Sequence, residues 1–230
     1  MIPSSLPAVL AALAFLGSAG LLVLLAGVAV YALVERRRRL ARLAGWGAAG
    51  LLAAYLCALA VVGLLNPERT LAPGTEKYFC EFDCHLAYSV VALDSLGPVG
   101  GDSTAWVVSV RTRFDERTIA SWRPREAPLS PGPRRVRLLV TGDQLLAPAA
   151  DNAARLARLG VASTPIDTEL RPGVSYVTSF VFDLPGAARP VSLDLEDQDL
   201  FPNRWLIGHE QSLLHGRILL GLPPSSSRSG

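Results

Sequence analysis

The sequence predicts a membrane protein in which two transmembrane α-helices form a hairpin and are followed by an all-β sandwich. The 230 residues are 50% hydrophobic and only 18% charged, with a mean hydropathy of +0.32, which is too apolar for an ordinary soluble domain of this length. The excess lies at the start of the chain, where residues 1–66 carry charge only between Glu35 and Arg42. Beyond residue 66, apolar and polar residues alternate as they do in half-buried strands.

The two helices are predicted from two runs without charge, Leu6 to Val34 and Leu43 to Leu65. About 20 helical residues cross the hydrocarbon of a bilayer, so each run is long enough to span it. The first run has no Lys or Arg before it and is about twice as long as the core of a cleavable signal peptide. We therefore expect helices at about 7–34 and 43–65 in a retained hairpin formed by residues 1–66.

The connecting loop, 35–42, is rich in arginine, and short loops of this kind stay in the cytoplasm. Both termini are then expected in the periplasm, in a multi-pass protein of a bacterial inner membrane. The same arginines are expected to contact anionic lipids. They are Arg36, Arg37, Arg38, Arg39 and Arg42.

The charge of the remaining chain argues against nucleic-acid binding. Removing the 5 basic and 1 acidic residues of 1–66 from the totals of 22 and 20 leaves 17 basic and 19 acidic residues in 67–230. A nucleic-acid-binding domain carries a basic face, and this composition does not predict one.

The interiors of the two helices contain no ionisable side chain, which argues against a proton path, an ion path or a histidine-ligated cofactor in the membrane. Small residues are frequent in both helices and permit close approach of helix backbones. Two interpretations stay open: these residues pack the hairpin on itself, or some of them dock other transmembrane helices. Cys57 is expected to be an inert small apolar residue.

Residues 67–222 are predicted to form one periplasmic β-sandwich domain, followed by a flexible tail, 223–230. Alternating patterns and turn residues predict strands within the following segments: Leu86–Leu93, Ala105–Phe114, Val136–Val140, Gln144–Leu146, Val174–Leu184, Val191–Leu195, Trp205–Gly208 and Ile218–Leu222. One short helix is expected after Asp151, ending at Gly160.

The order of these strands, with a Gly-Asp turn in the second hairpin and the segments 170–175 and 180–185, resembles the immunoglobulin-like extracytoplasmic domains of unknown function of bacterial lipoproteins and membrane-anchored proteins. The resemblance covers roughly residues 86–200. It implies an immunoglobulin-like sandwich that serves as a binding or interaction module. The chain departs from the usual pattern in having two spanning helices, and it lacks the Cys, Trp, Cys spacing of antibody domains.

Cys80 and Cys84 are predicted to form a disulfide in an oxidising compartment. In an extended strand their Cα atoms would lie about 13 Å apart, beyond the limit of about 7 Å for a bridge, so the disulfide requires a turn between them. The alternative is a metal or redox site of Cys80, Cys84 and His85, completed by His209 or His215. No cofactor is predicted.

Trp122, Arg123 and Arg125 are candidate partner-docking residues, because an exposed aromatic ring beside guanidinium groups is typical of an interface. The alternative is that Trp122 only covers an edge of the sandwich. We expect a non-enzymatic accessory or structural subunit of a larger membrane complex, such as a respiratory or photosynthetic electron-transfer assembly. Its partners would be other integral membrane subunits and their periplasmic surfaces.

Overall fold

The computed structural model describes residues 6–79, 86–98, 102–119, 124, 126–132, 134–197 and 201–227. They divide into two compact units. One unit comprises Leu6–Glu68 and Asp199–Arg217, and the other comprises Arg69–Gln198 and Ile218–Gly230. The sequence predicted a single division at residue 66. The structure differs, because Asp199–Arg217 belongs with the helices and not with the sandwich.

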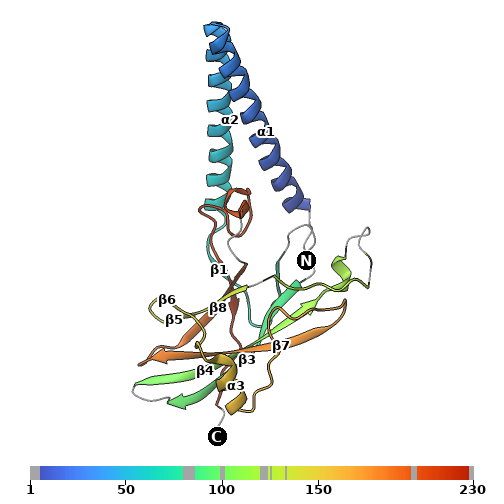
Figure 1. The fold of residues 1–230 in the computed structure, drawn as a ribbon. Helices are drawn as coiled ribbons and strands as arrows, with labels where there is room; N and C mark the ends of the chain where they lie inside the picture. The colour runs from blue at the N-terminus through green and yellow to red at the C-terminus, as the bar shows by residue number, and fades with distance from the viewer. Residues whose placement is uncertain are drawn as a thin grey trace. The chain divides into compact units, whose positions relative to one another are not determined.

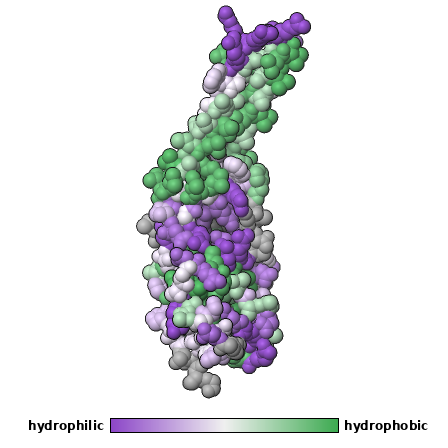
Figure 2. All heavy atoms as spheres, turned by 90° about the vertical axis from the view of Figure 1, so that its left-hand side faces the viewer, coloured by the Kyte–Doolittle hydropathy of each residue, from purple (hydrophilic) through white to green (hydrophobic). Residues whose placement is uncertain are grey.

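The helical unit consists of α1 (Leu6–Val34) and α2 (Arg38–Leu65), which are joined at one end and diverge toward the other (Figure 1). Val9–Val34 and Arg38–Leu65 are long and apolar enough, by length and composition, to cross a membrane. Figure 2 shows an apolar surface along the helices and a hydrophilic cap at the end where they join.

The turn between the helices is shorter than the predicted loop, 35–42. It contains only residues 35–37, with Arg36 in the left-handed region at φ 56°, and α2 begins at Arg38. Arginine is a good helix former, so Arg38, Arg39 and Arg42 extend α2 instead of interrupting it.

The second unit is a β-sandwich-like domain of two sheets. The first sheet has the order β1 (Arg69–Thr70), β9 (Ile218–Gly221), β8 (Pro190–Asp197), β5 (Arg134–Val140) and β6 (Gln144–Leu146). The second has the order β10 (Ser226–Ser227), β3 (Leu86–Pro98), β4 (Ser103–Phe114) and β7 (Ser175–Pro185), with β2 (Lys77–Phe79) paired to β3. The longest ladders, β3 with β4 and β4 with β7, are antiparallel.

One hydrophobic core lies between the two sheets, because the apolar side of each strand faces the other sheet. Tyr88 and Val108 of the second sheet share this core with Leu138, Leu193 and Leu220 of the first, and all five are buried. The strand periodicity thus predicted the inward faces of β4 and β7.

The open edge of β7 is closed by the segment that carries α3 (Asn152–Arg158). The Asn152 amide donates to the Ser179 carbonyl oxygen at 3.1 Å and accepts from the Val181 N–H at 2.7 Å. The Ala149 N–H donates to the Val181 carbonyl oxygen at 2.8 Å. These bonds occupy edge groups that would otherwise be available to another strand.

Two further predictions are wrong. Trp205–Gly208 is not a strand: the short 3-10 helix η2 (Asn203–Trp205) ends there and turns follow it. The predicted flexible tail contains β10, since the Ser226 hydroxyl hydrogen-bonds to the carboxylate of Asp94, a mostly buried residue of β3. A second 3-10 helix, η1 (Glu116–Thr118), follows β4 and is capped by the Asp115 carboxylate.

Candidate functional site

The two helices pack through one stripe on each. The less exposed positions of α1 recur every three or four residues, as expected for one helix face. They include Ala11, Phe15, Ser18, Leu22, Leu25, Ala29 and Ala32. The corresponding positions of α2 include Ala41, Ala44, Ala48, Leu51, Tyr55, Leu59 and Val62. Alanine supplies most of the close contact near the joined end.

Most glycines of the helices lie away from these stripes. A Cβ atom added at Gly17, Gly20, Gly27, Gly45 or Gly50 would have no atom within 4 Å. These glycines therefore do not hold the hairpin together. On α1 they lie within about 80° of one another around the helix axis, so they share one exposed face.

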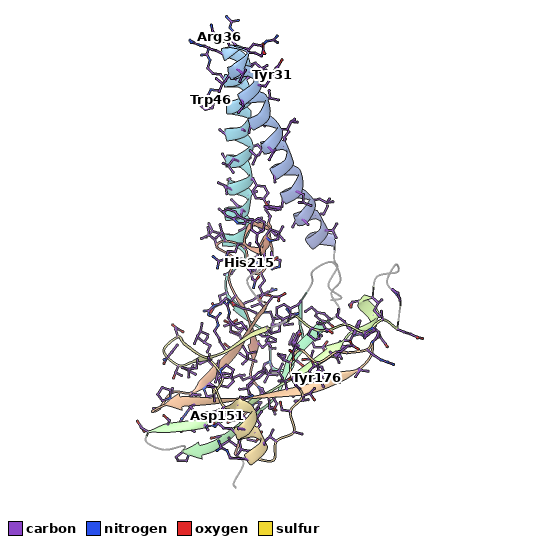
Figure 3. The ribbon with its side chains drawn as sticks, in the orientation of Figure 1. Tyr31, Arg36, Trp46, Asp151, Tyr176 and His215 are labelled. Atoms are coloured by element: carbon purple, nitrogen blue, oxygen red, sulfur yellow. The ribbon has the colours of Figure 1, made fainter. Side chains whose placement is uncertain are left out.

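The joined end of the hairpin carries aromatic and cationic side chains. Tyr31 and Trp46 are exposed and lie near Arg36 (Figure 3). Aromatic rings and arginines are also found together where membrane proteins meet lipid headgroups.

The helical unit also contains a segment that sequence reasoning assigned to the sandwich. Residues 201–217, which we call the insertion, leave β8 and return to β9. The Tyr55 hydroxyl donates to the Trp205 carbonyl oxygen at 2.5 Å. A Cβ atom added at Gly63 would lie 2.5 Å from the Leu213 carbonyl oxygen, so the two backbones touch.

Other contacts fix both ends of the insertion. The rings of Phe15 and Phe201 meet edge to face with centroids 6.1 Å apart. At the other end, the Gly216 N–H donates to the Asn66 carbonyl oxygen at 2.8 Å, and Arg217 pairs with Glu68 at 2.7 Å. The signal available in the sequence was a cluster of large apolar residues between β8 and β9 that the sandwich does not bury: Phe201, Trp205, Leu213 and Leu214.

A network of charged and phenolic side chains lies on β2 and β4 of the sandwich. Arg113 binds Glu76 through two bonds of 2.8 and 2.6 Å and reaches Asp115 at 3.1 Å. The Tyr78 hydroxyl is 2.8 Å from the Asp115 carboxylate and 3.0 Å from Glu76. Arg117 also binds Asp115, at 3.1 Å.

This network shifts the pKa values of its members. The hydrogen bond from Arg113 lowers the pKa of Glu76 despite partial burial. Burial raises the pKa of Asp115, but hydrogen bonds from Arg117, Arg113 and Tyr78 outweigh it and hold that pKa below its usual range. Burial and the adjacent carboxylates raise the pKa of Tyr78. Both carboxylates are therefore ionised and Tyr78 is neutral at pH 7, and their contacts fix the start of the domain to β4.

A second group of cations fixes Phe79, the last residue of β2. The Lys77 ammonium and the Arg134 guanidinium lie 5.0 and 4.4 Å from the centroid of its ring. Lys77 donates to the carbonyl oxygens of Leu195 and Ile218, at 2.6 and 2.8 Å, so its charge is held by the first sheet. The chain is therefore held firmly just before Cys80.

Several predicted site residues lie outside the described residues: Cys80, Cys84, His85, Trp122, Arg123 and Arg125. His209 and His215 belong to the insertion, where the His209 Nδ1 accepts from the Gln211 N–H at 3.1 Å and the His215 ring contacts the Gly216 carbonyl oxygen. No group of three or more His, Cys, Asp or Glu suited to a metal ion occurs among the described residues.

The described structure is that of a β-sandwich-like domain joined to two apolar helices of membrane-spanning length. The chain matches no protein-family model and no curated protein. It is similar to MPT63, a secreted protein from Mycobacterium tuberculosis, with 11% identity over 67% of this chain and 97% of that chain and a TM-score of 0.42. It is also similar to a conserved hypothetical protein from Bacillus anthracis, with 14% identity over 54% of this chain and 87% of that chain and a TM-score of 0.36. Neither likeness carries an argument about function.

Proposed function

We propose that this chain is a non-enzymatic accessory subunit of a larger complex in a bacterial inner membrane. In this proposal α1 and α2 span the membrane, both termini are periplasmic, and the sandwich is an immunoglobulin-like interaction module. The arginines around Arg36 lie on the cytoplasmic side and contact anionic lipids. Respiratory and photosynthetic electron-transfer assemblies are candidate hosts.

The observation that carries the proposal is the position of the glycines. Without a hydrophobic driving force between helices in lipid, association depends on close packing at small residues. Gly17, Gly20 and Gly27 form an open face on α1 and take no part in the contact with α2. This face supports the second interpretation of the small residues, in which they receive a helix of another subunit.

The sandwich supports the proposal in a different way. Several of its charged side chains are engaged inside the fold: Glu76 with Arg113, Asp194 with Arg137 and Asp183 with Arg155. These pairs join neighbouring segments and stabilise the domain. A rigid domain of this kind is suited to presenting loops to a partner.

The test is native mass measurement after gentle detergent extraction from the native membrane. We expect the 24.5 kDa chain in a larger assembly, and we expect Gly20→Leu to release it. Val30→Leu, also on the exposed surface of α1 but not at a glycine, is the matched control and should leave the assembly intact. A chain that is monomeric in the unmutated form would contradict the proposal.

Membrane orientation needs its own measurement. A reporter that is active only outside the cytoplasm, fused after Gly230, should be active in the full chain. A second reporter that works only in the cytoplasm, fused at the same position, should be inactive. If it is active, the sandwich lies on the cytoplasmic side and that part of the proposal is overturned.

A further inference from the structure

The insertion meets α2 at its end and also meets both helices deeper within their apolar stretch. Tyr55 precedes the last residue of α2, Leu65, by ten residues, which is about 15 Å along a helix. Phe15 follows the first residue of α1 by nine residues, or about 14 Å. The two anchor points, on antiparallel helices, are thus at nearly the same depth from the open end of the hairpin.

A hydrocarbon layer is about 30 Å thick, so a point about 14–15 Å from the open end lies inside it when the helix ends lie at its border. If α1 and α2 span the membrane, the contacts of Phe201 with Phe15 and of Trp205 with Tyr55 fall inside it. The polar pair of Arg217 with Glu68 falls at the end of α2, where a membrane interface would be. Aromatic residues therefore make the deep contacts, with Arg204 next to Trp205 in the chain, and an ion pair lies where the insertion leaves the helices.

Apart from Arg204 and Gly208, the exposed residues of the insertion are large and apolar. Phe201 is 80% exposed, Leu214 63%, Leu213 41% and Trp205 38%. Leu214 has φ +66°, a left-handed conformation that costs a non-glycine residue about 1–2 kcal/mol. The backbone of Leu214 lies directly against Gly63 of α2, while its side chain is exposed.

Part of the backbone of the insertion is paired within the segment, which lowers the cost of placing irregular backbone in a membrane. The N–H groups of Trp205, Leu206 and Leu213 donate to the carbonyl oxygens of Pro202, Asn203 and Arg204. Those of His209, Ser212 and His215 donate to carbonyl oxygens within the insertion as well. The Trp205 carbonyl accepts from Tyr55, a side chain of the helix itself.

The charged residues of the insertion do not contradict a lipid environment. Arg204, His209 and Glu210 each have an interaction partner. Ionisable groups at membrane depth are tolerated when they are paired, or when long side chains extend to the interface.

We propose that the insertion is a re-entrant segment that lies in the lipid leaflet at the open end of the hairpin, with Phe201, Trp205, Leu213 and Leu214 against acyl chains. The occupant of this surface is lipid, because Phe201 and Trp205 meet the apolar stretches of α1 and α2 and, with Leu213 and Leu214, expose large apolar side chains beside them. The inference rests on the proposed membrane-spanning role of the helices. It assigns to residues 201–217 a second site of membrane attachment.

The test uses the full chain with Cys57→Ser, reconstituted in vesicles of phosphatidylcholine and phosphatidylglycerol. A nitroxide label is attached, without reductant, at Leu214→Cys, Leu213→Cys, Leu24→Cys or Gln144→Cys. The protein without an added cysteine is the blank. Collisions of each label are measured with oxygen, which concentrates in hydrocarbon, and with a water-soluble nickel chelate. Leu24 is the lipid reference on α1, and Gln144, an exposed residue in the β5–β6 hairpin, is the water reference.

The inference expects the labels at 213 and 214 to favour oxygen over the chelate, as at Leu24. If they favour the chelate as Gln144 does while Leu24 favours oxygen, the re-entrant segment is overturned and the spanning helices are retained. If Leu24 also favours the chelate, the proposed membrane role fails.

A second measurement needs no new cysteine. Vesicle lipids brominated on the acyl chains quench tryptophan fluorescence at short range. Emission is compared between the unmutated chain and Trp205→Phe, with and without brominated lipid. The part of the emission that disappears in Trp205→Phe should be a part that brominated lipid quenches. A loss confined to the unquenched fraction would place Trp205 in water and overturn the inference.

Discussion

The Tyr55 hydroxyl donates a hydrogen bond of 2.5 Å to the carbonyl oxygen of Trp205, a residue 150 positions later in the chain. This single bond joins the middle of α2 to η2, and it satisfies a carbonyl group that has left regular structure. A hydrogen bond of this kind contributes about 0.5–1.5 kcal/mol to stability. The contact therefore contributes to holding the insertion on the helix.

Tyr55→Phe removes this donor and little else. We expect amide hydrogen exchange in residues 203–215 to accelerate about tenfold, which corresponds to about 1.4 kcal/mol of local stability. The measurement is hydrogen exchange with mass detection on the full chain in detergent. Tyr31→Phe, at an exposed tyrosine near the other end of the hairpin, should leave exchange in this segment unchanged. Equal exchange in all three proteins would mean that the bond contributes nothing.

Gly63 provides a steric test of the same contact. Its Cα lies so close to the insertion that an added methyl group would be 2.5 Å from the Leu213 carbonyl oxygen and 3.0 Å from the Leu214 carbonyl carbon. Both obstacles are backbone atoms and cannot turn aside, so we expect Gly63→Ala to cost about 1–3 kcal/mol and to release the insertion.

Gly50→Ala is the matched control, because it introduces the same methyl group on the same helix into open space. Alanine is the better helix former, so this variant should be neutral or slightly more stable. Thermal unfolding of the full chain in detergent, together with proteolysis within 201–217, separates the two. A cost shared by both variants would indicate a general effect of the substitution instead of this contact.

Asn152 supports the edge of the sandwich with one donor and one acceptor, and the two can be separated. Asn152→Ala removes both and should lower the free energy of unfolding by about 2 kcal/mol, since two backbone groups of β7 lose their partners. Asn152→Asp keeps the acceptor for the Val181 N–H but cannot donate to Ser179, so its loss should be smaller.

The control for Asn152 is Arg158→Ala. This residue lies on the same short helix, in an exposed ion pair with Asp151, and pairs of this kind contribute about 0–1 kcal/mol. Denaturant unfolding of the full chain, followed through the emission of buried Trp106, gives the free energy of unfolding of Asn152→Ala, Asn152→Asp and Arg158→Ala. An Asn152→Ala variant as stable as the Arg158→Ala control would contradict the edge role.

The network around Arg113 predicts acid sensitivity of the sandwich. The pKa values of Glu76 and Asp115 are lower in the folded chain than in the unfolded one, so the unfolded state binds more protons as pH falls. The stability they contribute is present above their unfolded pKa values of about 4 and is lost as pH falls through the folded values. We expect the free energy of unfolding to decline below about pH 5.

Arg113→Met tests the cause of this decline. It removes the principal partner of Glu76, so the sandwich should lose roughly 2 kcal/mol at neutral pH, and the further loss on acidification should be smaller. Arg158→Met should retain the full acid dependence, because its partner is exposed. Denaturant unfolding at a series of pH values gives the dependence of the free energy of unfolding on pH for both variants. Parallel curves for Arg113→Met and the unmutated chain would assign the acid loss to other groups.

The parts of the fold that depend on local pattern could be predicted, and those that depend on distant contacts could not. The alternation from Ala105 to Phe114 reports one apolar face and therefore predicted β4 directly. Trp205–Gly208 is a short apolar run, yet it is not a strand, because Tyr55 of α2 binds the Trp205 carbonyl and Val62 lies beside Gly208. Such contacts join residues about 150 positions apart and leave no periodic signal in the sequence.

The exposed glycine face of α1 and the pairing of the tail with β3 could not be predicted from the sequence either. Counting small residues identified the helices as able to pack closely, but the outward position of Gly20 required the structure. Asp94 could not be identified as a partner of the tail, because a single acidic residue in an apolar strand has no pattern of its own. Its pairing with Ser226 depends on the parallel alignment of β10 with β3.

The predicted disulfide between Cys80 and Cys84 can be tested by counting thiols. Phe79 and Leu86, the described residues on either side of this segment, are register partners of the antiparallel pair β2 and β3. The chain has three cysteines, and Cys57 is a free thiol. We expect one reactive thiol per chain in unreduced, unfolded protein and three after reduction.

Two variants make the count specific. Cys57→Ser should leave no reactive thiol before reduction, whereas Cys80→Ser should leave two, because Cys84 loses its partner. Metal analysis of the same preparation tests the alternative site of Cys80, Cys84 and His85, in which a metal ion holds the thiolates. Three reactive thiols without reduction, together with a stoichiometric metal ion in the folded chain, would replace the disulfide with that site.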